Sequence, residues 1–299
     1  MARAVDLDFT YSLIDRIFRL SLGEMADFSG AKFDGNFALT IEQAQRAKHD
    51  LVARSVGLQS GSRVIDLGCG WGPFLNYARA QGAKGVGLTL SQGQYQACLR
   101  NGLDVHVMDC RAVPRSAFGG FDAAVSLGAF EHFSSPEEFR AGRQDEIYRG
   151  FFRSVADLVP DRGRLFLQTM VFGRNMIAPD RIDINAPRDS DEWILALLRA
   201  QFPGSWLPSG RDQIERAAAP VFRLVAAENG RLDYIETIKR WRERFAAFSF
   251  RKALVKLTLA PRYFTSRRFR DAFTSGVSAN SVCFQRELLD HWRLVFEKV

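Results

Sequence analysis

Cysteine is scarce in this sequence and long apolar runs are missing, and these absences exclude several classes of protein. The 299 residues include four cysteines, none in C-x-x-C spacing, so we expect neither a disulfide framework nor a zinc site. Histidine, Asp and Glu do not cluster at metal-ligand spacing, so we expect no bound metal. No stretch approaches the roughly 18 apolar residues that span a bilayer, and the start of the chain lacks the apolar centre of a signal peptide. We therefore expect a globular, cytoplasmic protein.

Acidic residues are fewer than basic residues toward the end of the chain. The formal net charge of the whole chain is +7. From Trp206 to Val299 there are 18 Lys and Arg against 10 Asp and Glu, so the first 205 residues are close to neutral. Clustered positive charge attracts anionic surfaces such as lipid head groups, acidic carrier proteins or nucleic acid. A solvated helical face would explain the same charge.

The rest of the chain is organised around the stretch from Val64 to Gly72, an apolar run followed by an acid and three alternate glycines. Only glycine lets the backbone turn tightly there and approach a ligand closely. The dinucleotide pattern G-x-G-x-x-G requires a glycine where Pro73 stands, which counts against NAD. The alternative to a nucleotide-binding turn is a glycine-rich strand-to-helix turn that has no function.

The pattern D-x-G-x-G-x-G instead resembles the first motif of S-adenosylmethionine-dependent methyltransferases, where the acid faces the ammonium end of the methionine. The residues that we expect to contact this cofactor are Asp66, Gly68, Cys69, Gly70 and Gly72.

Polar side chains that could bind the ribose and adenine follow the next two predicted strands. Many nucleotide-binding sheets place an acid at the ribose, whereas this chain offers hydroxyls and an amide. The residues expected there are Thr89, Leu90, Ser91 and Gln94. Asp109 can accept a hydrogen bond from the adenine amino group while the Cys110 backbone meets the ring edge, although Asp109 could instead cap a helix.

Strand-like and helical segments alternate after residue 57, which predicts an α/β fold with a mostly parallel, doubly wound sheet. Strands are expected at 63–67, 85–89, 105–108, 121–127, 164–169 and 292–296, and helices at 13–20, 40–56, 72–80, 93–101, 148–158, 233–248 and 266–277. The stretch 180–220 is expected to be irregular because prolines recur in it.

The chain is expected to form one domain with four parts. These are an N-terminal helical segment at 1–57, a cofactor-binding core at 58–172, a substrate-binding or lid insertion at 173–280, and the terminal part of the sheet at 281–299.

Several motifs together resemble one family, the cyclopropane fatty acid and mycolic acid cyclopropane synthases, which are S-adenosylmethionine-dependent methyltransferases acting on lipid double bonds. The resemblance covers about residues 24–299. It rests on Thr40–Lys48, Asp66–Gly72, Gly87–Ser91 with Gln94, Ser126–His132, and Asp233 and Tyr234 with Thr237 and Trp241. It implies a Rossmann-like class I methyltransferase fold with helical N-terminal and lid segments, and it assigns Ser29 to the cofactor.

The resemblance also implies how the acceptor is handled. Methylation of a double bond leaves a carbocation, which an anion or base must stabilise while water is excluded. In the family a bound bicarbonate is that base, held by a glutamate, a tyrosine, a histidine and a backbone near a cysteine. Glu131 and Tyr234 match, but Gln168 replaces the histidine and Gly30 the cysteine. These departures count against bicarbonate and ring closure, and they make simple methyl transfer a competitor.

His132 follows Glu131 and could act as a general base, although both residues could instead serve only to cap a helix. The first hypothesis is methyl or methylene transfer to carbon of an unsaturated fatty acyl chain. The alternatives are N-, O- or C-methylation of a soluble small metabolite, and a cofactor-binding protein without catalysis. A nucleic-acid methyltransferase is disfavoured because there is no N/D-P-P-Y motif.

The resemblance implies that two segments are longer here than in the family. Residues 134–145 are expected to form a loop at the mouth of the site. Residues 245–264 mix aromatic and basic side chains, and could lie on an anionic membrane surface or meet an acyl carrier. A helix that closes over the core, or a homodimer interface, would explain the same pattern equally well.

Overall fold

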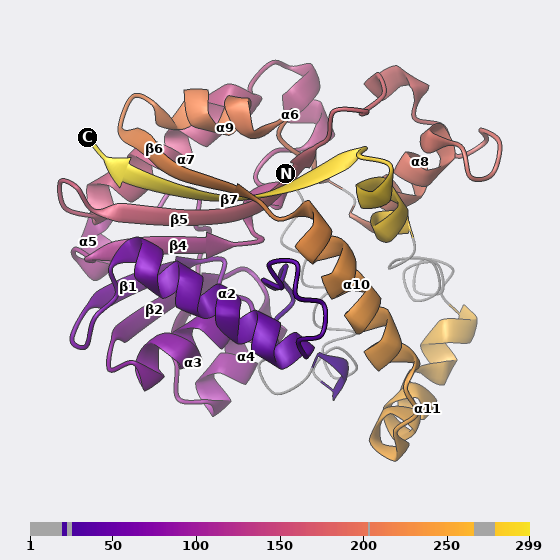
Figure 1. The fold of residues 1–299 in the computed structure, drawn as a ribbon, viewed down its shortest axis with the longest axis horizontal. Helices are drawn as coiled ribbons and strands as arrows, with labels where there is room; N and C mark the ends of the chain where they lie inside the picture. Colours follow the sequence, from indigo (N-terminus) through magenta and orange to yellow (C-terminus); the bar gives the residue numbers. More distant parts are fainter. Residues whose placement is uncertain (1–19, 23–25, 203, 266–278) are drawn as a thin grey trace.

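A seven-stranded sheet with helices on both faces forms the body of the molecule in this computed structural model (Figure 1). The structure describes residues 20–22, 26–202, 204–265 and 279–299. The strands, in chain order, are β1 Arg63–Leu67, β2 Lys84–Thr89, β3 Asp104–Val107, β4 Ala123–Leu127, β5 Arg164–Phe172, β6 Phe222–Asn229 and β7 Leu289–Lys298.

The strand order across the sheet is β3-β2-β1-β4-β5-β7-β6. The first five strands are parallel, and β7 pairs antiparallel with both β5 and β6. The expected Rossmann-like, mostly parallel α/β fold is therefore confirmed. In such sheets ligands bind beyond the carboxyl ends of the strands, where the order reverses, here between β1 and β4.

The helices that lie wholly within the described residues are α2 Ile41–Val56, α3 Pro73–Ala80, α4 Gln92–Arg100, α5 Arg115–Phe118, α6 Pro136–Arg140, α7 Gln144–Leu158, α8 Asp191–Gln201, α9 Arg211–Ala218, α10 Arg231–Ala246 and α11 Phe250–Thr265. Residues 279–285 are also helical. Short 3-10 turns, η1 and η2, span Phe130–His132 and Pro179–Arg181. None of the described helices is both long and apolar enough to cross a membrane.

Alternate side chains of the strands supply two cores, because successive residues of a strand point to opposite faces. Val64 and Phe166 pack with α2 and α3 on one face, whereas Ile65, Leu165 and Leu167 pack with α7 and α9 on the other. Figure 1 shows α10 and α11 extending from the end of the sheet near the carboxyl ends of β1 and β4. A third cluster of apolar residues is centred there.

Two expectations about local structure are wrong, and one strand was not expected at all. The stretch 180–220 contains α8 and α9, because none of its prolines falls within either helix. Residues 222–229 form the edge strand β6, and a register shift between Leu224 and Ala226 disrupts its alternation. Residues 134–145 are not a simple loop, since a capping box of Ser135 and Glu138 begins α6. The expected helix at 266–277, and most of that at 13–20, lie outside the described residues.

Candidate functional site

The glycine turn joins β1 to α3 and lies against two neighbouring strands. The backbone N–H groups of Gly68 and Cys69 donate to the Leu88 carbonyl at 3.0 and 2.8 Å. Gly68 has a φ of 95°, and a Cβ there would lie 2.2 Å from the Ala129 Cβ. A side chain at position 68 would therefore push the loop after β4 away from the turn.

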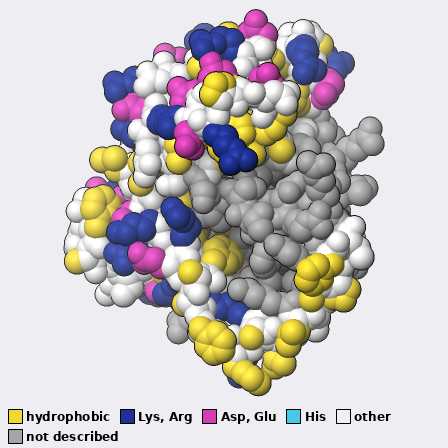
Figure 2. Space-filling view, turned by 90° about the vertical axis from the view of Figure 1, so that its right-hand side faces the viewer, with side chains coloured by type: hydrophobic (Ala, Val, Ile, Leu, Met, Phe, Trp, Pro, Cys, Tyr) yellow, Lys and Arg dark blue, Asp and Glu magenta, His cyan; other side chains and the backbone are white. Residues whose placement is uncertain are grey.

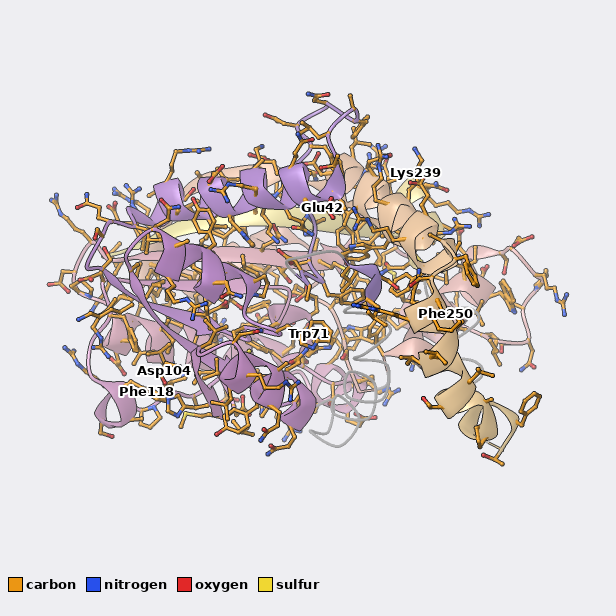
Figure 3. The ribbon with its side chains drawn as sticks, turned by 90° about the horizontal axis from the view of Figure 1, so that it is seen from below. Glu42, Trp71, Asp104, Phe118, Lys239 and Phe250 are labelled. Atoms are coloured by element: carbon orange, nitrogen blue, oxygen red, sulfur yellow. The ribbon has the colours of Figure 1, made fainter. Side chains whose placement is uncertain are left out.

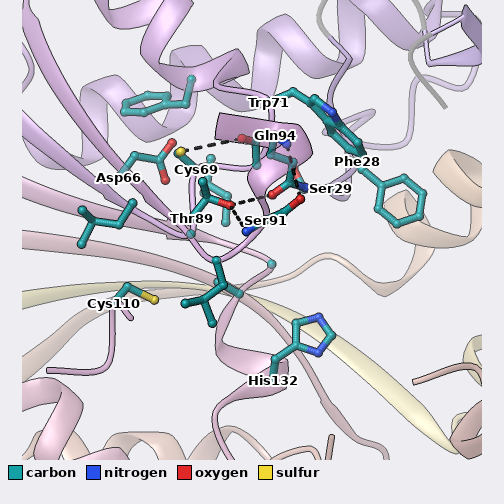
Figure 4. Close-up of a pocket in the computed structure, with 18 of the residues that line it drawn as sticks. Phe28, Ser29, Asp66, Cys69, Trp71, Thr89, Ser91, Gln94, Cys110 and His132 are labelled. Carbon is teal, nitrogen blue, oxygen red and sulfur yellow. Dashed lines mark hydrogen bonds between the residues drawn. The ribbon is translucent and has the colours of Figure 1, made fainter. Parts of the chain in front are cut away.

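A cavity opens beside this turn at the carboxyl ends of β1 and β2 (Figure 4). Its lining includes the expected cofactor residues Ser29, Asp66, Gly68, Cys69, Gly70, Thr89, Leu90, Ser91, Gln94, Asp109 and Cys110. We call it the cofactor cavity. Residues from four separate segments thus meet at one place, as a nucleotide site at a strand-order reversal requires.

Gly72 is not among the residues that line the cofactor cavity. Its φ is 77°, and a Cβ there would lie 2.4 Å from Leu103 Cδ1 and 3.3 Å from Cys98 Sγ. The structure therefore places Gly72 where α3 packs closely on the segment before β3. Sequence reasoning also assigned no cofactor contact to Phe28, Trp71 and Met108, which line the cavity. Trp71 lies within the Asp66–Gly72 motif, and Phe28 directly precedes Ser29.

Polar side chains that line the cofactor cavity are held in place by neighbouring polar groups. Thr89 Oγ1 donates to Gln94 Oε1 at 2.7 Å, and Ser91 caps α4 by accepting from the Gln94 N–H. Asp109 accepts from Arg111 Nη2 at 2.6 Å. Although burial alone would raise the pKa of Asp109, these hydrogen bonds from Arg111 lower it, so Asp109 is a carboxylate.

Buried charges lie beneath the cofactor cavity. Lys48 Nζ bonds to Asp27 Oδ2 and to Ser29 Oγ, the latter at 2.6 Å. His49 Nε2 lies 2.9 Å from the same Asp27 oxygen. Burial would raise the pKa of Asp27, but Lys48 and His49 hold it well below its ordinary value. The Ser29 loop is thereby fixed to α2 by a buried ion pair.

Asp66 differs from Asp27 because it has no such partner. Its Oδ1 is buried without a hydrogen bond to any described residue. Burial, together with the Asp27 charge, raises the pKa of Asp66 to about 8, and Lys48 offsets this only in part. A buried carboxylate that lines a cavity and lacks a counterion fits a ligand with a cationic group. The residues present therefore fit S-adenosylmethionine, whose ammonium group would restore the charge of Asp66.

A second cavity, which we call the acceptor cavity, adjoins the first. Most of its lining is apolar, and includes Met170 and Phe172 of β5, Leu195 and Leu198 of α8, and Trp206. His132 lines both cavities, so the two meet at the end of η1.

Glu131 and His132 are the polar groups at this junction. Glu131 Oε1 accepts from the Met170 N–H at 2.8 Å, while its Oε2 is buried without a partner among the described residues. Burial raises the pKa of Glu131 to about 7. His132 Nδ1 lies 2.8 Å from Ser205 Oγ, and burial lowers the pKa of His132 to about 4, so its ring is neutral. No motif pointed to Ser205, which is 73 residues away from His132.

The other two expected catalytic residues lie around Gly30 and do not line either cavity. Gln168 Nε2 donates to the Gly30 carbonyl at 3.1 Å. Tyr234 stacks on His291 with ring centroids 4.8 Å apart and planes within 2°. A Cβ on residue 30 would lie 2.6 Å from the Tyr234 ring and 2.9 Å from His291 Cε1. The missing side chain at Gly30 thus makes room for His291, to which the sequence assigned no role.

The family model described as mycolic acid cyclopropane synthetase matches residues 2–293. The chain belongs to this family. Cyclopropane mycolic acid synthase 3 of Mycobacterium tuberculosis is 30% identical over 236 residues, which are 77% of this chain and 78% of that protein. The cyclopropane-fatty-acyl-phospholipid synthase of Escherichia coli is 29% identical over 96% of this chain and 66% of its own length.

Solved structures agree with the family assignment. Cyclopropane synthase MmaA2 from Mycobacterium tuberculosis is 25% identical, with a TM-score of 0.76 over 99% of this chain and 98% of that one. Mycolic acid cyclopropane synthase CmaA1, solved with SAH and CTAB, has a TM-score of 0.78 at 24% identity and shares the fold over 99% and 98%. The chain is an S-adenosylmethionine-dependent carbon methyltransferase of the cyclopropane synthase type, as the motifs predict.

Proposed function

We propose that this chain transfers a methyl or methylene group to an unsaturated fatty acyl chain bound in the acceptor cavity, with Glu131 as the general base. The observation that carries this proposal is that the cofactor cavity and the acceptor cavity share His132 in their lining. His132 joins a cavity that fits the cofactor to an apolar cavity that holds the buried Glu131 carboxylate, whose Oε2 has no partner among the described residues. S-adenosylmethionine, when bound, supplies an electrophilic methyl group.

The walls of the acceptor cavity suit an acyl chain better than a small polar metabolite. Apolar side chains exclude water, which would otherwise capture a cationic acceptor. Glu131 Oε2 is free to face positive charge as it develops on the acceptor, and then to accept a proton from it. A pKa near 7 is close to the optimum for a base working at neutral pH.

We further propose that Glu131 acts without bicarbonate in this chain. Gln168 stands where the family has a histidine, and its amide bonds to Gly30 and to Arg293, the latter at 3.4 Å. The space that a cysteine side chain would fill at Gly30 is taken by Tyr234 and His291. Activity in carefully degassed, carbonate-free buffer should equal that with added bicarbonate, and stimulation by bicarbonate would refute this part.

Mass analysis of a lipid extract incubated with the pure protein and methyl-labelled S-adenosylmethionine tests the reaction itself. We expect label in acyl chains, and the loss or retention of unsaturation then separates ring closure from simple methylation. Label confined to water-soluble products would refute the acyl acceptor and favour a soluble metabolite.

We also propose that α11 binds an anionic membrane surface from which the acceptor is taken. Five apolar side chains in or beside it are exposed, Phe248 by 88%, Phe250 by 71%, Leu254 by 49%, Leu257 by 68% and Phe264 by 75%. Figure 2 shows hydrophobic side chains gathered at the lower end of the face where α11 lies. In Figure 3, Phe250 lies far from Asp104, the residue that begins β3, and so on the side of the sheet where the parallel strands end.

Vesicle flotation tests the membrane proposal. The doubly substituted Phe250→Asp, Leu254→Asp chain should lose binding to phosphatidylglycerol vesicles, whereas Leu99→Asp, at an exposed position on α4, should not. Equal flotation of all three chains would refute a role for α11. Dimer formation, or binding to an acyl carrier in place of vesicles, would assign the same face to one of those partners.

A further inference from the structure

The acceptor cavity continues into a third, outer cavity. The two cavities share Ile182, Arg199, Phe202 and Ser205. The outer cavity is also lined by exposed residues, with Ile184 51% accessible, so it faces solvent. A molecule that reaches Glu131 from this side must therefore pass Arg199.

Arg199 is the cation at this passage, and its charge is not neutralised. Its guanidinium lies over the Trp206 ring, 5.6 Å from the centroid. Within the described part of the chain no carboxylate forms an ion pair with it. Other arginines around α8 do have partners, since Arg181 pairs with Glu192 and Arg286 with Asp191. Stacking on Trp206 holds the planar guanidinium while leaving its N–H donors available.

Two acids also line the outer cavity, but each is engaged elsewhere. Asp183 Oδ1 accepts from the Asn185 N–H at 2.9 Å and from its side-chain amide at 3.1 Å. Glu137 Oε1 lies 3.9 Å from Arg140 Nη1. Arg199 is thus the positive group available to a ligand where the apolar cavity meets the outer one.

We propose that Arg199 and the outer cavity form a head-group subsite for an acyl substrate that ends in a carboxylate or a phosphate. The guanidinium fork binds two oxygens of the anion, and the chain runs inward past Trp206 to Glu131 and His132. This inference rests on the proposed acyl acceptor and adds the charge of its head group. It also fixes the direction of entry, with the head outward.

Equilibrium binding to the full chain, loaded with S-adenosylhomocysteine, tests this subsite. The probes are oleate, methyl oleate and oleoyl lysophosphatidate, which share one chain and differ in the head group. Arg199→Gln should weaken oleate binding about tenfold and leave methyl oleate unchanged, because one charge-assisted pair is lost. Arg199→Lys should retain most of the affinity for oleate. The control Arg188→Gln removes the same charge from an exposed position outside both cavities and should change nothing.

The comparison between the two anions identifies the source of the head group. Tighter binding of the lysophosphatidate assigns the subsite to a lipid phosphate, and tighter binding of oleate assigns it to a free carboxylate. Equal weakening of oleate and methyl oleate by Arg199→Gln would overturn the subsite while leaving the acyl acceptor intact. If the unaltered chain binds none of the probes and labels no acyl chain, the proposed function fails with it.

Discussion

The cofactor cavity and the acceptor cavity meet at His132 but are built in different ways. The first is lined by glycine turns and polar groups over a buried ion pair between Asp27 and Lys48. The second is mostly apolar, with Glu131 as its buried acid. Under the proposed function, one cavity holds a charged molecule by polar contacts and the other excludes water from a reaction on carbon.

Replacing Gly68 by Ala should disrupt the cofactor cavity and have the largest effect of the changes considered. The new Cβ would lie 2.2 Å from Ala129 Cβ in a backbone with positive φ. We expect cofactor binding to be lost and the free energy of unfolding to fall by about 3 kcal/mol. Calorimetric titration with S-adenosylhomocysteine and urea unfolding would measure both.

Gly61→Ala is the matched control for Gly68→Ala. Gly61 also has a positive φ, of 86°, but a Cβ there would meet nothing within 4 Å. It should therefore cost only about 1 kcal/mol of backbone strain and leave cofactor affinity unchanged. Equal behaviour of the two variants would show that the close approach to Ala129 is unimportant.

Glu131→Gln should impair the reaction in the acceptor cavity and leave the cofactor cavity intact. The amide keeps the shape of the side chain but cannot take a proton, so we expect turnover to fall by about 10²–10³-fold with S-adenosylhomocysteine affinity preserved. The same change at exposed Glu146 on α7 should have no effect. Turnover that survives in the Glu131 variant would mean that another group is the base.

The pH dependence of cofactor binding should distinguish Asp66 from Asp109, two acids that line the cofactor cavity. The pKa of Asp66 is raised to about 8, and binding of an ammonium group favours its ionised form, so affinity should rise by up to tenfold per pH unit from pH 6 to 8. Asp66→Asn should abolish this slope. Asp109→Asn should retain it, because the pKa of Asp109 is lowered and does not titrate in this range.

The same titration of Asp66 should affect stability with the opposite sign when no cofactor is present. The folded state holds the Asp66 proton to about pH 8, whereas in the unfolded chain the pKa returns to 3.8. The free energy of unfolding should therefore fall as the pH rises from about 4 to about 8. Urea unfolding of the unaltered chain and of Asp66→Asn would show a smaller decrease for the variant, and identical slopes would contradict this assignment.

Ser205→Ala should have the smallest effect on turnover. Ser205 contacts His132, the residue that lines both the cofactor cavity and the acceptor cavity. The substitution removes the hydrogen-bond partner of His132 Nδ1 without changing either cavity wall greatly. We expect a severalfold loss of turnover, corresponding to about 1 kcal/mol, with cofactor affinity unchanged. Steady-state kinetics should show recovery in Ser205→Thr, which keeps the hydroxyl.

Local patterns allowed much of the cofactor cavity to be predicted. A tight turn beside a ligand needs glycine, and a strand end that meets a cofactor needs polar side chains close in sequence to the strand. Asp66, Gly68 and Gly70 were therefore recognisable from spacing alone. Gly72 shares that spacing but packs against Leu103, because a motif specifies a backbone path and not which neighbour the path approaches.

Local sequence patterns predicted much less of the acceptor cavity and its surroundings. The edge strand β6 lacks clear alternation and is stabilised by pairing with β7, more than 60 residues later. His291 reaches Tyr234, and Ser205 reaches His132, across similarly long separations. Each of these residues looks ordinary in its own segment, since a contact between distant segments leaves no periodic signal in either one.

The sequence by itself determined the α/β alternation, the cofactor turn and the acid beside it, because each depends on backbone geometry within a few residues. Only the tertiary structure decided that Arg199 stands free over Trp206, that His291 fills the space above Gly30, and that the acceptor cavity opens at His132. Those features arise where β5, α8 and β7 converge, and packing in three dimensions selects them.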